Sequence, residues 1–284
     1  MKRTCFDAEI RSRSLSFENA GVRIVCDRKA LPGIEWFAPS GETLWNSNEP
    51  DSFRRLEFFA ERSTGLRKDS RNALSTVEHL APVLLLYPES RFEIRALAGE
   101  LPILGGSAYP WYEAIRNLAG LPQELRFYDA PLRERFEWNG GFCEVSPAET
   151  LEIEYSVSHG EFSDSAFAAI YDAEDLVKLF PARTFIFEDD LEKARAAGLL
   201  SCADECSGVL LSKGRNPVCL VGGPLRMKSE PAFHKILDLV GDISLPAPIL
   251  PRLRIRIHNG GHVAHRKLLE RLMDYAFRNA SQVG

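Results

Sequence analysis

The sequence predicts an α+β protein that contains a duplicated structural unit. Segments that alternate between polar and apolar residues, as strands do, are interspersed with amphipathic helical segments along the 284-residue chain. His79 and His234 each lie near the start of a predicted helix, and Gly105-Gly106 and Gly260-Gly261 each precede one, at the same offset of 155 residues. A constant offset between matching features indicates an internal repeat. We therefore expect two equivalent helices that each contribute a histidine.

The first half is predicted to contain strands, a long loop and two helices. Residues 6–17, 22–26 and 92–97 have strand patterns, whereas residues 31–52 and 102–110 have the composition of loops. Ser75-Thr76-Val77-Glu78 fits a capping box, which predicts a helix from residues 74–75 to 87. A second, short helix is predicted over residues 111–118.

Residues 120–122 are the predicted boundary between two domains, 1–121 and 122–284. Beyond them, residues 132–138 and 142–145 flank Asn139-Gly140-Gly141, a pattern that predicts a hairpin. Further strands are predicted at 151–157, 209–212, 218–222 and 253–258. Helices are predicted at 164–179 and 190–199, from Ser229 and Pro231 to about residue 240, and over about 263–279.

Composition and charge narrow the class of protein. Hydrophobic residues make up 45% and charged residues 26% of the chain, as in soluble globular proteins. The net charge of −5 argues against nucleic acid as the main partner. No segment approaches the ~20 apolar residues of a transmembrane helix. Charged residues follow Lys2 and Arg3 at once, which argues against a signal peptide. Six scattered cysteines are typical of reduced thiols, so we expect a cytoplasmic protein.

The segment His234-Lys235-Ile236-Leu237-Asp238 is the most informative cluster. On a helix, His234 and Asp238 lie one turn apart on the same face, so an imidazole and a carboxylate could bind one cation. A third ligand must come from elsewhere, and His79 is the candidate. Two histidines and one carboxylate, with an open position, form the ligand set of a hydrolytic zinc site.

Glu78 and Asp242 would complete such a site. A free carboxylate beside the ion, as at Glu78, can take a proton from water that the ion activates. Asp242, four residues beyond Asp238, would support the site rather than bind the ion. On spacing alone two simpler interpretations stay open. His234 and Asp238 could form a solvated ion pair, and Glu78 could be only the capping-box glutamate.

Five ordered segments, together, resemble the UDP-3-O-acyl-N-acetylglucosamine deacetylases, the zinc amidases of lipid A synthesis. Ser75-Thr76-Val77-Glu78-His79-Leu80 resembles their first zinc motif, and His234 to Asp238, continuing to Gly241-Asp242, resembles their second. The other three are Pro102-Ile103-Leu104 with Gly106-Ser107-Ala108 and Pro110, then Ala182-Arg183-Thr184-Phe185, and finally Gly261-His262. Five motifs in one order are far more specific than any single motif.

The resemblance implies an α+β fold of two similar two-layer domains, each a sheet with helices on one side. The helices of the two domains would face each other, with the active site between them. It also implies that His79, His234 and Asp238 bind zinc, although the sequence leaves open whether Zn²⁺ or Fe²⁺ occupies the site.

The resemblance implies further roles. Glu78 would be the general base, and His262, supported by Asp242, the protonated general acid. Thr184 would help stabilise the oxyanion, Lys235 would add positive charge at the substrate, and Phe185 would line the pocket. The implied activity is release of acetate from the N-acetyl amide of UDP-3-O-acyl-N-acetylglucosamine or a closely related acylated amino sugar, which is the expected partner.

The chain departs from the family pattern outside these motifs. Residues 14–19 lack the His-Thr-Gly of the family, Gly105 and Ile186 replace an Asp and a Gly, and His265 stands where an Asn is usual. The resemblance implies that these positions belong to loops that hold the rest of the substrate, so the exact substrate stays open. Arg252, Arg254 and Arg256 could bind a diphosphate or form a solvated sheet face.

Two other functions are compatible with the sequence. The altered loops would suit a non-catalytic relative that binds an acylated sugar nucleotide and regulates its pathway. Two histidines and one carboxylate also describe the site of an iron oxygenase. Those enzymes usually carry their ligands on a barrel of strands, and a ligand-bearing helix does not fit that pattern.

Overall fold

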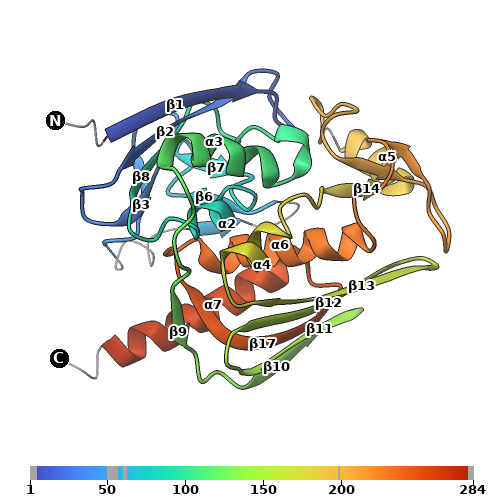
Figure 1. The fold of residues 1–284 in the computed structure, drawn as a ribbon. Coiled ribbons are helices and arrows are strands. Elements are labelled where there is room, and N and C mark those ends of the chain that lie inside the picture. Colours follow the sequence, from blue (N-terminus) through green and yellow to red (C-terminus); the bar gives the residue numbers. More distant parts are fainter. Residues whose placement is uncertain (1–4, 50–56, 60–62, 198, 281–284) are drawn as a thin grey trace.

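The computed structural model describes residues 5–49, 57–59, 63–197 and 199–280. It confirms an α+β chain with several sheets and helices. Two larger sheets lie at opposite sides of the molecule, and α2, α6 and α7 lie between them (Figure 1).

The first sheet has five strands in the order β1-β2-β8-β3-β4. Their bounds are Cys5–Ser12 (β1), Ala20–Asp27 (β2), Gly33–Phe37 (β3), Thr43–Asn46 (β4) and Arg91–Ala96 (β8). The loop predicted for residues 31–52 is wrong over β3 and β4, and residues 50–52 lie outside the described residues. The glycine, proline and serine residues around these short strands gave the segment the composition of a loop. Its apolar side chains nevertheless pack in the core, where Trp36 and Trp45 are buried.

The second sheet repeats the arrangement of the first. Its main path is β10-β11-β17-β12-β13, with the short β9 added beside β17. Along each five-strand path the third and fourth strands are parallel and the other neighbours are antiparallel, and β9 pairs parallel to β17. The bounds are Phe127–Asp129 (β9), Glu134–Trp138 (β10), Gly141–Pro147 (β11), Leu151–His159 (β12), Phe162–Ile170 (β13) and Leu250–His258 (β17). The common order and directions support the internal repeat.

The helix predicted over residues 164–179 is wrong. Residues Phe162–Ile170 form β13, which pairs with β12, and only Ala173–Val177 (α4) is helical. Three alanines favour a helix by intrinsic propensity, but pairing with a neighbouring strand overrides it. Asp172 accepts hydrogen bonds from the N–H groups of Glu174 and Asp175, which fixes the start of α4.

Two three-stranded sheets complete the part of the fold that the structure describes. One contains Glu57–Phe59 (β5), Gly65–Arg67 (β6) and Ala73–Ser75 (β7), and the other Phe185–Phe187 (β14), Val209–Leu211 (β15) and Cys219–Val221 (β16). Helix α5, Glu188–Ala196, follows β14, and the two lie at one end of the molecule in Figure 1. The predicted elements at 190–199, 209–212 and 218–222 are therefore confirmed with small shifts.

The remaining helices are α2 (Ala81–Leu84), the short 3-10 helix η1 (Leu104–Gly106), α3 (Tyr109–Ala119), α6 (Glu230–Ser244) and α7 (Gly261–Ala280). The helix predicted from residues 74–75 to 87 starts much later, because Ser75 ends β7 and Thr76 has a φ of 60°. The Thr76 hydroxyl donates to Glu100, 2.9 Å away, and holds this turn. Glu78 and His79 therefore lie on a turn rather than on a helix, and the capping-box interpretation of Glu78 is wrong.

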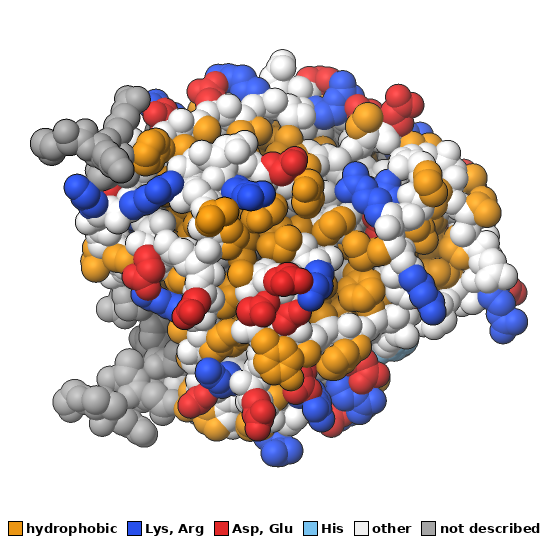
Figure 2. Space-filling view, viewed as in Figure 1, with side chains coloured by type: hydrophobic (Ala, Val, Ile, Leu, Met, Phe, Trp, Pro, Cys, Tyr) orange, Lys and Arg blue, Asp and Glu red, His pale blue; other side chains and the backbone are white. Residues whose placement is uncertain are grey.

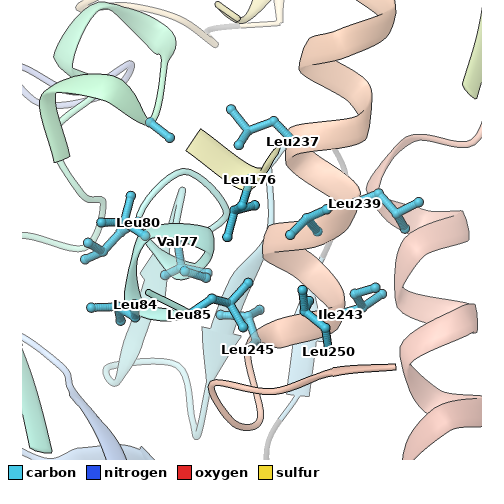
Figure 3. Close-up of a cluster of buried hydrophobic side chains, with 14 of the residues drawn as sticks. Val77, Leu80, Leu84, Leu85, Leu176, Leu237, Leu239, Ile243, Leu245 and Leu250 are labelled. Carbon is cyan, nitrogen blue, oxygen red and sulfur yellow. The ribbon is translucent and has the colours of Figure 1, made fainter. Parts of the chain in front are cut away.

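Buried side chains around α2 and α6 join the two repeats. Figure 3 shows Val77, Leu80, Leu84 and Leu85 on one side and Leu237, Leu239 and Ile243 of α6 on the other. They belong to one continuous hydrophobic core. The backbones also approach closely, since a Cβ added at Gly241 of α6 would lie 2.1 Å from the carbonyl oxygen of Glu78. This contact sets the position of Glu78 relative to α6.

The surface carries mixed charge. On the face in Figure 2, acidic and basic side chains are interspersed around a region of hydrophobic side chains. Arg254 and Arg256 of β17 pair with Glu152 and Glu154 of β12, and Arg252 with Asp129 of β9, on the exposed face of the second sheet. This arrangement favours the solvated face over the diphosphate site. Within the described part of the chain, no helix combines the length and the apolar character needed to cross a bilayer.

Candidate metal centre and active site

His79, His234 and Asp238 converge at one buried point between the two repeats. His79 comes from the turn before α2, and the other two come from α6. Their ligand atoms all lie within 4.8 Å of one another, and each residue is at most 3% exposed. The Oδ1 atom of Asp238 is 3.2 Å from His234 Nε2 and 3.5 Å from His79 Nε2. The predicted trio is therefore brought together.

The donor set fits a divalent cation. His234 Nδ1 lies 3.2 Å from the carbonyl oxygen of Ala182, which can only accept, so Nδ1 carries the proton and Nε2 presents its lone pair toward Asp238. Burial lowers the pKa of His234 to about 3, so the ring is neutral, as a ligand must be. Asp238 Oδ1 is buried without a hydrogen-bond partner. A cation among these atoms would satisfy this otherwise unpaired oxygen.

Glu78 lies beside the three candidate ligands, and its carboxylate faces Thr64 and His262. Its Oε2 accepts a hydrogen bond from the backbone N–H of Thr64, 3.1 Å away, and its Oε1 is 4.0 Å from His262 Nε2. Burial raises the pKa of Glu78 to about 7, although His262 and His79 oppose the rise. A carboxylate with a pKa near neutrality is suited to accept a proton from water and release it again.

His262 lies in the first turn of α7, on the other side of Glu78. Its Nδ1 donates to Asp242 Oδ2 over 2.9 Å, while its Nε2 lies 3.8 Å from Asp238 Oδ2. Burial opposes the charged ring, but Asp242, Asp238 and Glu78 outweigh that penalty and raise the pKa of His262 to about 9. His262 is therefore an imidazolium at neutral pH and can donate a proton.

A cavity of about 700 Å³ opens beside His262 and Lys235. Thr184 and Phe185 also line it. Lys235 donates to Asp238 Oδ2 over 2.8 Å, and its Nζ lies 5.7 Å from the centre of the Phe185 ring. Thr184, Phe185, Lys235 and His262, the four other residues predicted for the site, thus line one cavity next to the candidate metal centre.

Part of the cavity wall is apolar. Phe162, Phe187 and Val209 line it and form a small hydrophobic cluster that also includes Leu211. These residues come from β13, β14 and β15, so the small sheet β14-β15-β16 shapes this part of the cavity. The space can therefore hold an apolar chain beside a polar reacting group.

A buried ion pair fixes the segment that carries Thr184. Arg183 forms a bidentate pair with Glu230 at the start of α6, with N–O distances of 2.7 and 3.0 Å. The N–H of Thr184 donates to the carbonyl oxygen of Gly106 over 2.6 Å. Gly106 has a φ of 73°, and a Cβ there would lie 2.5 Å from Thr184 Cγ2. Glycine is therefore required at this position for the close approach.

Sequence reasoning did not assign roles to three residues that contact the site. Thr64 binds Glu78 through its N–H, and its hydroxyl lies 3.1 Å from His262 Nδ1. His265 and Tyr155 are fully buried behind Asp242. Thr64 and Tyr155 belong to no recognised sequence motif. His265 was identified only as a position where the chain departs from the usual Asn of the family. Thr64 lies in a loop, Tyr155 on β12 and His265 on α7, so their shared surroundings arise from the fold rather than from a local sequence pattern.

The chain was compared with known proteins. The sequence profile of the UDP-3-O-acyl N-acetylglycosamine deacetylase family matches residues 43–274. A protein of Synechocystis named UDP-3-O-acyl-N-acetylglucosamine deacetylase is 30% identical over 210 residues, which cover 71% of this chain and 74% of that protein. A protein of the same name from Aquifex aeolicus is 31% identical over 207 residues, or 70% and 69% of the two chains.

The matched region contains the three candidate ligands together with Glu78, Asp242 and His262. The profile covers well over half of the chain, and the first relative is covered over more than two thirds of its length. The chain therefore belongs to the UDP-3-O-acyl-N-acetylglucosamine deacetylase family.

Proposed function

We propose that this protein hydrolyses the N-acetyl amide of UDP-3-O-acyl-N-acetylglucosamine and releases acetate, in lipid A biosynthesis. As a member of a deacetylase family it is an amide hydrolase. The observation that carries the proposal is the convergence of His79, His234 and Asp238. Beside them lie Glu78, which is suited to accept a proton, and His262, which is suited to donate one. The regulatory and oxygenase hypotheses are set aside, because the relatives are named as deacetylases.

Zn²⁺ is the proposed occupant of the metal centre, with His79, His234 and Asp238 as its ligands. Two imidazoles and one carboxylate are a common protein ligand set for catalytic zinc, and Fe²⁺ accepts the same donors. When bound, the ion would supply Lewis acidity that makes water more acidic and polarises a carbonyl group.

Glu78 is the proposed general base. Its carboxylate is held by the N–H of Thr64, so one oxygen is fixed while the other faces the centre of the site. Glu78 accepts the proton from the attacking water as the carbon–oxygen bond forms.

His262 is the proposed general acid. An amine leaves an amide poorly unless its nitrogen is protonated, and the imidazolium of His262 holds that proton at Nε2. Asp242 accepts from Nδ1 and keeps Nε2 directed toward Glu78 and Asp238. Asp242 thus supports the acid without touching the substrate.

Thr184, Lys235 and Phe185 are proposed to contact the substrate. The Thr184 hydroxyl can donate to the oxyanion that develops on the carbonyl oxygen, and Lys235 can add positive charge nearby. Phe185 presents an aromatic wall, and the apolar part of the cavity suits a 3-O-acyl chain. These assignments make the acylated sugar nucleotide the small-molecule partner.

We also propose that the repeat forms two two-layer domains, 1–121 and 122–284, with their helices facing each other across the site. The common strand order of the two larger sheets and the location of α2, α6 and α7 between them support this division (Figure 1). A cytoplasmic location is proposed because all six cysteines are free thiols, which is usual in a reducing compartment.

Mass spectrometry of the reaction product tests the function. Zinc-loaded protein should convert UDP-3-O-acyl-N-acetylglucosamine into a product that has lost one acetyl group. A chelator should abolish the conversion, and added Zn²⁺ should restore it. If the zinc-loaded protein leaves this substrate and a panel of related N-acetylated amino sugars unchanged, the proposed function is wrong.

A further inference from the structure

A buried hydrogen-bonded chain extends from the proposed acid to the cavity wall. Asp242 Oδ2 contacts His265 Nδ1 at 2.7 Å as well as His262 Nδ1 at 2.9 Å. On its other side, His265 Nε2 contacts the Tyr155 hydroxyl at 2.9 Å. His265 and Tyr155 are 0% exposed. The mechanism above uses only the contact between Asp242 and His262.

The chemistry of the groups fixes the direction of each hydrogen bond. Asp242 is ionised, because His262 and His265 outweigh its burial and lower its pKa, so it only accepts. Each ring therefore donates from Nδ1. Burial also lowers the pKa of His265, which keeps that ring neutral and leaves a lone pair on Nε2. The Tyr155 hydroxyl must then donate to His265 Nε2.

Tyr155 also holds the backbone beside His262. The N–H of Gly261, the residue before His262, donates to the Tyr155 oxygen over 2.9 Å. Gly261 has a φ of 61° and begins α7. One hydroxyl on β12 therefore restrains His262 in two ways, through the start of its helix and through His265 and Asp242.

We propose that Tyr155 and His265 are positioning residues that hold His262 in its proton-donating orientation. Neither touches the reacting atoms, and both act through His262 and Asp242. This inference rests on the proposed function, since it assigns their effect to the acid of that reaction. The physical basis is geometric, because an acid displaced by about 1 Å can lose on the order of 100-fold in rate.

One substitution at Tyr155 and one at a matched control residue, Tyr87, test the restraint that the Tyr155 hydroxyl places on His262. Tyr155→Phe removes the hydroxyl and keeps the ring. In zinc-loaded protein we expect kcat for UDP-3-O-acyl-N-acetylglucosamine to fall on the order of 10- to 100-fold with KM nearly unchanged. Tyr87→Phe is the control, because Tyr87 is also buried and its hydroxyl also binds a glycine backbone, at Gly120. It should lose similar stability and keep its kcat.

Substitutions at His265 test the second restraint. His265→Leu leaves Asp242 without one donor and should lower kcat, whereas His265→Asn can place an amide N–H near the position of Nδ1. We expect Asn to restore kcat to within roughly threefold of the wild type. Zinc content and melting temperature, measured on each variant, separate loss of the ion or of the fold from misplacement of the acid.

Two-bond ¹H–¹⁵N spectra of the full-length protein test the same chain without turnover. We expect His265 to carry its proton on Nδ1, and Tyr155→Phe to shift the ring signals of His262 while Tyr87→Phe leaves them in place. A His265 proton on Nε2, or unchanged His262 signals together with unchanged kcat in Tyr155→Phe, would overturn the proposal. If the wild type has no turnover, the proposed function fails and the spectra alone decide whether Tyr155 and His265 orient His262.

Discussion

The two repeats share a five-strand order and supply the residues of the proposed active site in different ways. The first repeat contributes Glu78 and His79 from a turn between β7 and the four-residue helix α2. The second contributes His234 and Asp238 from one face of the 15-residue helix α6. A regular helix presents two ligands by its periodicity alone. The turn instead presents a proposed ligand, His79, and the proposed base, Glu78, in different directions.

The turn depends on side-chain hydrogen bonds that the helix does not need. Thr76 has a positive φ, which costs a β-branched residue energy, and Glu100 binds its hydroxyl. Glu100 also accepts a hydrogen bond from Ser14 of the segment after β1. The candidate metal centre is thus built from a strained turn in the first repeat and from a regular helix in the second.

Removing one ligand from each repeat is the strongest test of this comparison. His79→Ala and His234→Ala should each lower zinc affinity by well over 100-fold, because loss of an outer partner alone typically costs about 10- to 100-fold. Zinc content after dialysis against a weak chelator measures the effect, and deacetylation should fall to background in both. If His79→Ala kept its zinc and its activity, α6 alone would hold the ion and the two repeats would not share it.

Glu78→Gln tests the base on the turn. The amide oxygen can still accept from the N–H of Thr64, so the local structure should remain while the proton acceptor is lost. We expect kcat to fall by about 10²- to 10⁴-fold, with zinc content unchanged. Steady-state kinetics and metal analysis on the same sample measure both. An activity within a few-fold of the wild type would remove Glu78 from the mechanism.

Gly241→Ala tests the contact between the repeats. The new Cβ would collide with the carbonyl oxygen of Glu78, so α6 or the turn must shift. We expect a loss of about 1–3 kcal/mol in the free energy of unfolding and a fall in kcat on the order of 10-fold or more. Gly99→Ala is the control, because its Cβ would meet only Phe17 at 3.7 Å. Equal effects of the two substitutions would contradict the special role of this contact.

The pH dependence of stability tests the charge of His262. Its pKa is raised to about 9 from an ordinary 6.5, so the stability that its charged form contributes is fully present below pH 6.5 and is lost as the pH rises through 9. In metal-free protein, urea unfolding should show His262→Asn less stable than the wild type at pH 6, with the difference narrowing toward pH 9.5. A difference that stays constant with pH would mean that folding does not shift the pKa of this ring.

Arg254→Ala should have the smallest effect. Arg254 pairs with Glu152 on the exposed face of the second sheet, as Arg91 pairs with Glu35 in the first. We expect less than about 1 kcal/mol of destabilisation, with KM for the sugar nucleotide unchanged. A large rise in KM would revive the diphosphate interpretation of this strand and would make the outer faces of the two repeats functionally different.

The sequence predicts the second repeat better than the first. In α6 the proposed ligands His234 and Asp238 follow helical spacing, so the local sequence pattern was enough to predict that they lie on one face. Around Glu78 the capping-box pattern predicted a helix that the fold does not form, because Glu78 binds Thr64 and Ser75 ends a strand. The contacts of Thr64 and Tyr155 join segments that are distant in the sequence, and no single-sequence pattern encodes them. The 155-residue offset could be recognised in the sequence because the paired histidines and the paired Gly-Gly segments all lie in or beside helices.

X-ray absorption at the zinc edge of the zinc-loaded protein tests most directly whether the two repeats share one ion. We predict only nitrogen and oxygen ligands at about 2.0–2.2 Å, with the outer-shell scattering of two imidazoles. His79→Ala should leave one imidazole or no bound zinc. Sulfur ligands at about 2.3 Å, which would place the ion at cysteines such as Cys202 and Cys206, would contradict the account.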